Sequence, residues 1–115
     1  MKSLILNELI KELREACNNN SSRVASKNEN ILHLENGDEE IVVFLSEKNI
    51  VFKYHSHTGM QKDELEEFLP LARFWKDNYS YRKYSLSILI GPNDWFYDLK
   101  KAKILGLIRG MNIKQ

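Results

Sequence analysis

The sequence contains a single cysteine and no long hydrophobic run, and both shortages exclude classes of protein. Cys17 has no partner for an internal disulfide bond, so nothing in the sequence indicates an oxidising compartment. The apolar run at the start is interrupted by Asn7, Glu8 and Lys11 before the core of a signal peptide is complete. No stretch approaches the roughly 18 consecutive apolar residues of a membrane span. We therefore expect a soluble, cytoplasmic protein that has no membrane partner.

Neither sign of charge is in large excess, since the net charge is only +1. The balance conceals an asymmetry: residues 1–72 carry 8 basic and 13 acidic residues, whereas residues 73–115 carry 9 basic and 3 acidic ones. A basic C-terminal third can meet a phosphate backbone or an acidic protein surface, or it can attract the acidic part of its own fold. The length of 115 residues is that of a single domain, which we place at 1–115.

Hydrophobic periodicity predicts an α+β fold with the element order α-β-β-β-α-β-α. Apolar residues at helical spacing, from Leu6 to Cys17, indicate a first helix over residues 3–17. Short β-rich runs indicate strands at 30–35, 40–46, 50–54 and 84–90. We expect these four strands to form a largely antiparallel sheet packed by helices, because the connections are too short for parallel crossovers. A second helix follows Thr58-Gly59, and Pro70 is expected to kink or break it near Leu69. Asn93 or Asp94 caps a third helix through about Leu107, and Gly106 and Gly110 fray its end.

Two side-chain patterns carry expectations about burial. The run from Ile41 to Leu45 is almost continuously apolar, as in a strand buried on both faces. Trp95 and Phe96 follow the last predicted strand, and we expect them to cover the edge of the sheet as part of the core.

Candidate catalytic and metal-binding motifs are sparse. His55 and His57 project to the same side of a strand, and the segment resembles the His-Ser-His start of metal-dependent deubiquitinase-type peptidases, although Thr58 replaces their proline. A third ligand at metal spacing is missing, so we expect the pair to bind no zinc. Cys17 lies on the apolar stripe of the first helix and is expected to be a small core residue. Nucleophile elbows, phosphate-binding loops and Cys-x-x-Cys pairs are absent.

Double-stranded RNA-binding domains share the order helix, three strands, helix. They grip phosphates through lysines at the start of the second helix, where this sequence has Asp63, Glu64, Glu66 and Glu67. Carboxylates at these positions would repel the nucleic-acid backbone. This class of RNA-binding domain is therefore disfavoured.

A broader resemblance covers residues 40–110. The segments Glu40-Ile41-Val42-Val43-Phe44 and Val51-Phe52-Lys53 are followed by the helical pattern 63–69 and the strand 87–92. In pattern and order these segments resemble a degenerate PD-(D/E)xK core, the restriction-endonuclease-like fold, and its bacterial and archaeal relatives. The resemblance implies a nuclease-like, bacterial-type fold.

The resemblance also implies a magnesium site in which two carboxylates hold Mg²⁺ beside a lysine. Lys53 matches the lysine, Glu40 or Asp38 replaces the first acid, and Glu8 or Glu12 stands for the acid of the first helix. The second acid falls on Val51, so the motif is incomplete unless Glu64 or Glu67 reaches in. We therefore expect no hydrolysis of DNA or RNA, and no cofactor or metal unless the nuclease alternative holds.

Aromatic and basic residues cluster around the fourth predicted strand and indicate a binding surface. Aromatic anchors with arginine dominate protein interfaces, and they also stack on bases. We place the partner-binding site at Tyr81, Arg82, Lys83 and Lys100. The predicted function is that of a small non-catalytic binding protein, of the regulator, inhibitor or immunity type, with a protein partner. The alternative is a nucleic-acid-binding or magnesium-dependent nuclease domain, and homo-oligomers are compatible with either.

Overall fold

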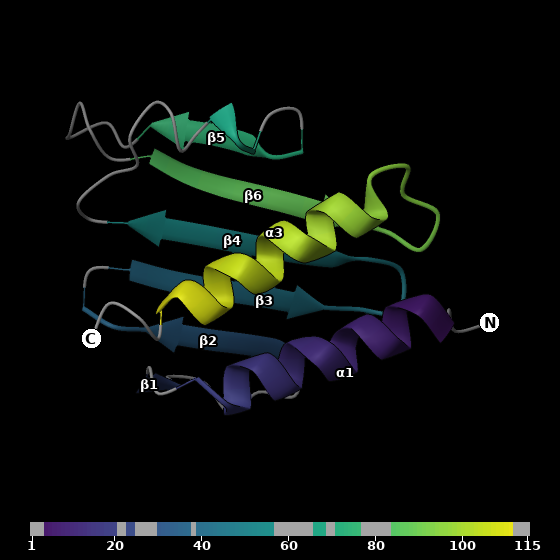
Figure 1. The fold of residues 1–115 in the computed structure, drawn as a ribbon, viewed down its shortest axis with the longest axis horizontal. Coiled ribbons are helices and arrows are strands. Elements are labelled where there is room, and N and C mark those ends of the chain that lie inside the picture. The colour runs from purple at the N-terminus through teal and green to yellow at the C-terminus, as the bar shows by residue number, and fades with distance from the viewer. Residues whose placement is uncertain are drawn as a thin grey trace.

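A computed structural model describes residues 4–20, 23–24, 30–37, 39–56, 66–68, 71–76 and 84–111. Two helices pack on one face of an antiparallel sheet (Figure 1). The elements in chain order are α1 Leu4–Asn18, β1 Arg23–Val24, β2 Ile31–Glu35, β3 Glu39–Leu45, β4 Ile50–Ser56, β5 Arg73–Lys76, β6 Tyr84–Ile90 and α3 Tyr97–Gly110. No helix within the described ranges is both long enough and apolar enough to cross a membrane.

The sheet has the strand order β1-β2-β3-β4-β6-β5, and every pair of neighbours is antiparallel. The central strands β2, β3, β4 and β6 confirm the predicted α+β class and the antiparallel meander. β1 and β5 extend this sheet at its two edges, where the sequence predicted no strand. Gly37, with a φ of 94°, makes the tight turn between β2 and β3 that the Asn36-Gly37 pair predicts.

Each central strand has one side in the core and one side toward the opposite surface. In β3, the core side carries Ile41, Val43 and Leu45, whereas Phe44 is 39% exposed. The expectation that this strand is buried on both faces is therefore wrong, because the described helices α1 and α3 cover only one face. We call the face under α1 and α3 the inner face and the opposite one the outer face.

The helices supply the other half of the core. α1 buries Leu6, Leu9, Leu13 and Cys17, the stripe that its periodicity predicts. α3 buries Ile104, Leu105 and Ile108. A hydrogen bond from Asn20 Nδ2 to the Ile108 carbonyl, 2.5 Å long, ties the end of α1 to α3.

The predicted limits of α3 need correction. The helix begins at Tyr97, later than Asn93 or Asp94, because Asp94 uses its side chain in the preceding turn. Asp94 Oδ1 accepts a hydrogen bond from the Phe96 N–H at 2.9 Å. The helix also continues through Gly106 to Gly110, so Gly106 does not fray its end.

The predicted second helix lies mostly outside the described residues, together with His57, Asp63, Glu64, Leu69 and Pro70. Within the described part, Phe68 is buried, and its carbonyl accepts hydrogen bonds from Leu71 (2.7 Å) and Ala72 (3.0 Å). The chain then enters β5 at Arg73.

Candidate partner-binding site

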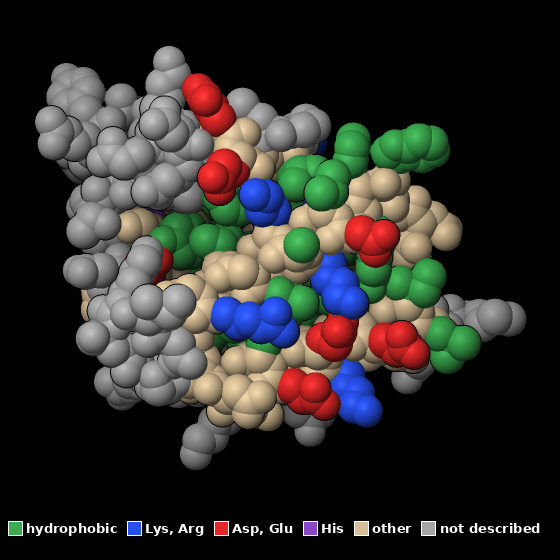
Figure 2. All heavy atoms as spheres, in the orientation of Figure 1, with side chains coloured by type: hydrophobic (Ala, Val, Ile, Leu, Met, Phe, Trp, Pro, Cys, Tyr) green, Lys and Arg blue, Asp and Glu red, His purple; other side chains and the backbone are tan. Residues whose placement is uncertain are grey.

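Large apolar side chains are exposed at one end of the molecule. Within the described ranges, seven of them are exposed: Leu4, Ile5, Phe44, Leu89, Trp95, Phe96 and Leu99. They belong to the start of α1, the ends of β3 and β6, and the segment from Trp95 into the first turn of α3, all of which meet at the right-hand end in Figure 1. We call this set the apolar end. Figure 2 shows hydrophobic side chains gathered there on the helix side.

Sheet register places two members of the apolar end in one row on the outer face. Phe44 pairs with Ile31 on one side and with Val51 on the other, and Val51 pairs with Leu89. Directly paired residues in antiparallel strands have Cβ atoms about 5 Å apart, so their side chains form a continuous apolar row. Phe44 is 39% exposed and Leu89 is 54% exposed, which makes the row accessible to a partner.

A pocket of about 490 Å³ adjoins this row. Its lining includes Val51 and Leu89 from the row, Arg73 and Ser87 from the next row, and Asp94 and Lys100 from beyond the strand. The pocket lies where β5 stops pairing with β6, since Arg73 opposite Ser87 is the last pair in that direction. Beyond that pair, the edge of β6 has no strand beside it among the described residues.

An ion pair closes this open edge. Lys100 Nζ lies 2.6 Å from Asp94 Oδ2, with side chains only 14% and 16% exposed, and it donates to the Leu89 carbonyl at 2.7 Å. Burial would raise the pKa of the Asp94 carboxyl, but the hydrogen bonds from Lys100 and from the Phe96 N–H outweigh it and leave the pKa below its ordinary value. The carboxylate therefore stays charged and holds the lysine in place.

Two cations on the outer face lack an ion pair among the described residues. Lys53 and Arg73 both pair with Ser87 in the register, so they stand in one row beside the apolar row. Both are exposed, and the Lys53 Nζ lies 5.6 Å from the centre of the Phe44 ring. This face therefore offers apolar contact and positive charge next to each other.

The nuclease-type residues that lie within the described ranges do not gather in one site. Glu40 and Lys53 share the outer face, but the Lys53 ammonium lies over Phe44, away from Glu40. Glu8 is exposed on α1, and this helix covers the opposite face of the sheet. Glu8 and Glu40 are thus held on different sides of the sheet, where one metal ion cannot bind both. Val51, at the position of the missing second acid, lines the pocket beside the apolar row.

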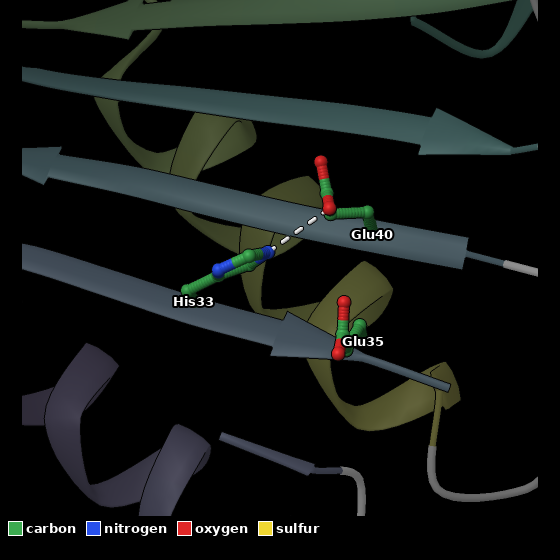
Figure 3. A group of neighbouring side chains, drawn as sticks. All are labelled: His33, Glu35 and Glu40. Atoms are coloured by element: carbon green, nitrogen blue, oxygen red, sulfur yellow. Dashed lines mark ion pairs between the residues drawn. The ribbon is translucent and has the colours of Figure 1, made fainter. Parts of the chain in front are cut away.

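Glu40 instead lies beside His33 and Glu35, as Figure 3 shows. One potential ligand atom from each of the three side chains lies within 4.8 Å of the other two. His33 Nε2 is 3.1 Å from Glu40 Oε2. These are the described residues best placed to hold a metal ion. His55, one of the two histidines singled out in the sequence, lies opposite Glu40 on β4, and its Nδ1 is 2.8 Å from the Ser85 hydroxyl.

The predicted partner-binding residues are only partly described. Tyr81, Arg82 and Lys83 lie outside the described residues, and their role stays a prediction. Lys100 lines the pocket, but most of its side chain is buried in the Asp94 ion pair.

Trp95 and Phe96 correct the expectation that they belong to the core, since they are 91% and 37% exposed. They stand on the turn after Gly91-Pro92, where the Asp94 hydrogen bonds hold the chain beyond the end of β6. The sequence-based predictions did not identify Phe44 and Leu89 as surface residues. Alternation with the core residues Val43 and Ile88 would have placed them on the outer face.

No family model and no curated protein matches the chain. Among solved structures, the chain is similar to the crystal structure of YbjN, a candidate transcription regulator from E. coli, with 14% sequence identity and a TM-score of 0.38. The match covers 90% of this chain and 91% of YbjN. A likeness of this size does not define a shared function.

Proposed function

We propose that this protein is a small non-catalytic binding protein that acts by contact with a protein partner through the apolar end. The observation that carries the proposal is that seven large apolar side chains of the described residues are exposed at one end of the molecule. Scattered exposed hydrophobic residues are ordinary, whereas a concentration of them marks an interaction surface.

Trp95 is the strongest anchor of this surface. Its side chain is 91% exposed, so almost all of its apolar area is available to a partner. Burial of an aromatic side chain of this size contributes on the order of 3 kcal/mol, and tryptophan is among the commonest residues that dominate binding energy.

Charge specifies the chemistry of the partner. Lys53 and Arg73 stand beside the apolar row without an ion pair among the described residues, and Arg73 also lines the pocket. A segment that places apolar side chains against Phe44 and Leu89 would bring its flanking residues to these cations. We therefore commit to a protein segment with apolar anchors flanked by aspartate or glutamate, because such a segment complements both rows.

Peptide selection followed by measured affinities tests the proposal. Peptides are selected from a displayed library on the wild-type protein, and their dissociation constants are measured by fluorescence anisotropy. We expect acidic peptides with aromatic or aliphatic anchors. Trp95→Ser and Leu89→Ser should each weaken binding by about thirtyfold, equivalent to about 2 kcal/mol. The control Arg109→Ser, in the last turn of α3 at the opposite end, should leave affinity unchanged.

Three other results would contradict this partner. Peptides that bind Trp95→Ser and Leu89→Ser as tightly as they bind the wild type would place the site elsewhere. Self-association in light scattering that Trp95→Ser abolishes would identify a second copy of the chain as the occupant. Tight binding to an oligonucleotide that falls steeply with salt would favour the nucleic-acid alternative. Cleavage of that oligonucleotide in Mg²⁺, lost in Glu40→Gln, would establish the nuclease alternative.

A further inference from the structure

We propose that His33, Glu35 and Glu40 form a binding site for one divalent transition-metal ion on the outer face of the sheet. The inference is independent of the protein-binding role of the apolar end. The three residues come from two neighbouring strands, β2 and β3, and the register fixes their relation (Figure 3). Glu35 lies directly opposite Glu40, and His33, two residues before Glu35, projects to the same side.

The two carboxylates stand in an arrangement that a cation would stabilise. Like charges directly opposite each other on adjacent strands are destabilising. The register places Arg23 of β1 opposite Glu35, whereas Glu40 has His55 opposite it on β4. Lys53, the described lysine nearest to Glu40 in the register, is paired with Val42, and its ammonium lies over the Phe44 ring. The described part of the outer face therefore gives Glu40 no lysine or arginine partner, and a bound cation would supply positive charge between the two carboxylates.

His33 provides an independent sign of a missing ligand. Its Nε2 atom is shielded from solvent, and its contact in the described structure is the ion pair with Glu40, whose Oε2 is 3.1 Å away but does not meet hydrogen-bond geometry. A buried ring nitrogen without a hydrogen bond is costly, and coordination to a metal would satisfy it. The nitrogen also faces the carboxylates that would be the other ligands (Figure 3).

The spacing suits a small metal ion after a modest adjustment. Ligand atoms that bind one ion at about 2.1 Å are at most about 4.2 Å apart. The three ligand atoms lie within 4.8 Å of one another, and the Glu40 side chain is 44% exposed, so a side-chain rotation can bring the ligand atoms closer. The strands themselves need not move.

The donor set selects the class of metal. An imidazole nitrogen with two carboxylates suits zinc and similar transition metals, whereas magnesium prefers oxygen ligands alone. Three protein ligands leave a coordination position open for water or for a donor from a partner. His55 lies across from Glu40 on β4 and is a neighbour of this site, outside the three proposed ligands.

Calorimetric titration of the full-length, untagged protein with zinc tests the proposal. We expect one equivalent to bind, with His33→Asn and Glu40→Gln each weakening the affinity at least tenfold. Two controls should bind as the wild type does: Glu8→Gln, which removes a carboxylate from α1, and His55→Gln, which removes the neighbouring imidazole. Zinc should also raise the melting temperature of the wild type but not of Glu40→Gln. This variant should fold normally, because the loss of the Glu40 carboxylate relieves its repulsion with Glu35.

Several outcomes would overturn the site. Absence of saturable zinc binding would do so, as would zinc binding that both His33→Asn and Glu40→Gln leave unchanged. Zinc binding lost in His55→Gln alone would assign the metal to the pair His55 and His57. Magnesium binding with equal affinity would refute the class of metal.

Discussion

The ammonium group of Lys100 donates a hydrogen bond to the backbone carbonyl of Leu89, at the point where β6 extends beyond its edge partner β5. The Nζ to O distance is 2.7 Å, and the same ammonium is held by Asp94 at 2.6 Å. A side chain from α3 thus replaces the hydrogen bond that a further strand residue would make. Exposed strand edges invite pairing with other chains, and a lysine placed there is a recognised way to prevent it.

Removal of this lysine should destabilise the fold. We expect Lys100→Met to lower the free energy of unfolding by about 2 kcal/mol, because it leaves the Asp94 carboxylate without its charged donor in a mostly buried place. Urea denaturation measures the change. The matched control is Lys103→Met, whose pair with Glu67 spans 3.8 Å and is more exposed, and it should cost less than about 0.5 kcal/mol. Equal losses in the two variants would show that the edge contact has no special role.

Acid should remove the contribution of the Asp94 carboxylate. Its pKa is lowered in the folded protein, so its stabilising effect is present above the unfolded value of about 3.9 and is lost as the pH falls through the folded value. The stability difference between wild type and Asp94→Asn should therefore be constant above about pH 5 and shrink below pH 4. Denaturation curves from pH 3 to 7 measure it, with exposed Asp98→Asn as the control. A difference that persists unchanged to pH 3 would contradict this assignment.

Periodicity predicted the central elements because their core contacts repeat at fixed spacing. α1 and the strands β2, β3, β4 and β6 lie within two residues of their expected limits for this reason. The edge strands carry weaker signals: β1 has only two residues, within a polar segment, and β5 has four. Tertiary pairing creates such strands, and local sequence does not show it.

The candidate sites depended on information that no single strand contains. Whether Phe44 or Val43 faces solvent is decided by which side of the sheet the helices cover. The metal cluster depends on the pairing of Glu35 with Glu40 across two strands, so the sequence drew attention to His55 and His57 instead of His33.

The Cys17 thiol should react very slowly in the folded protein. The residue is 4% exposed, and burial raises the pKa of its thiol to about 11. At pH 8 the thiolate fraction is then lower by about a hundredfold than for an ordinary cysteine. Reaction with a disulfide reagent should therefore proceed through transient opening and accelerate in the destabilised variant Leu13→Ala. A rapid, stoichiometric reaction of the native wild type would show that the thiol is accessible.

The neighbouring valines of β3 provide a matched test of the two faces of the sheet. Val43 is fully buried against the helices, whereas Val42 is partly exposed between His33 and Lys53 on the outer face. Val43→Ala should lower the free energy of unfolding by about 2 kcal/mol, since it removes buried methyl groups and leaves a cavity. Val42→Ala removes the same atoms from a half-solvated position and should cost about 0.7 kcal/mol or less. Urea denaturation of both variants at pH 7 decides between the alternatives. Equal costs would mean that β3 is packed on both faces, as its continuous apolar run first indicated, and would leave no accessible outer face for a partner or a metal ion.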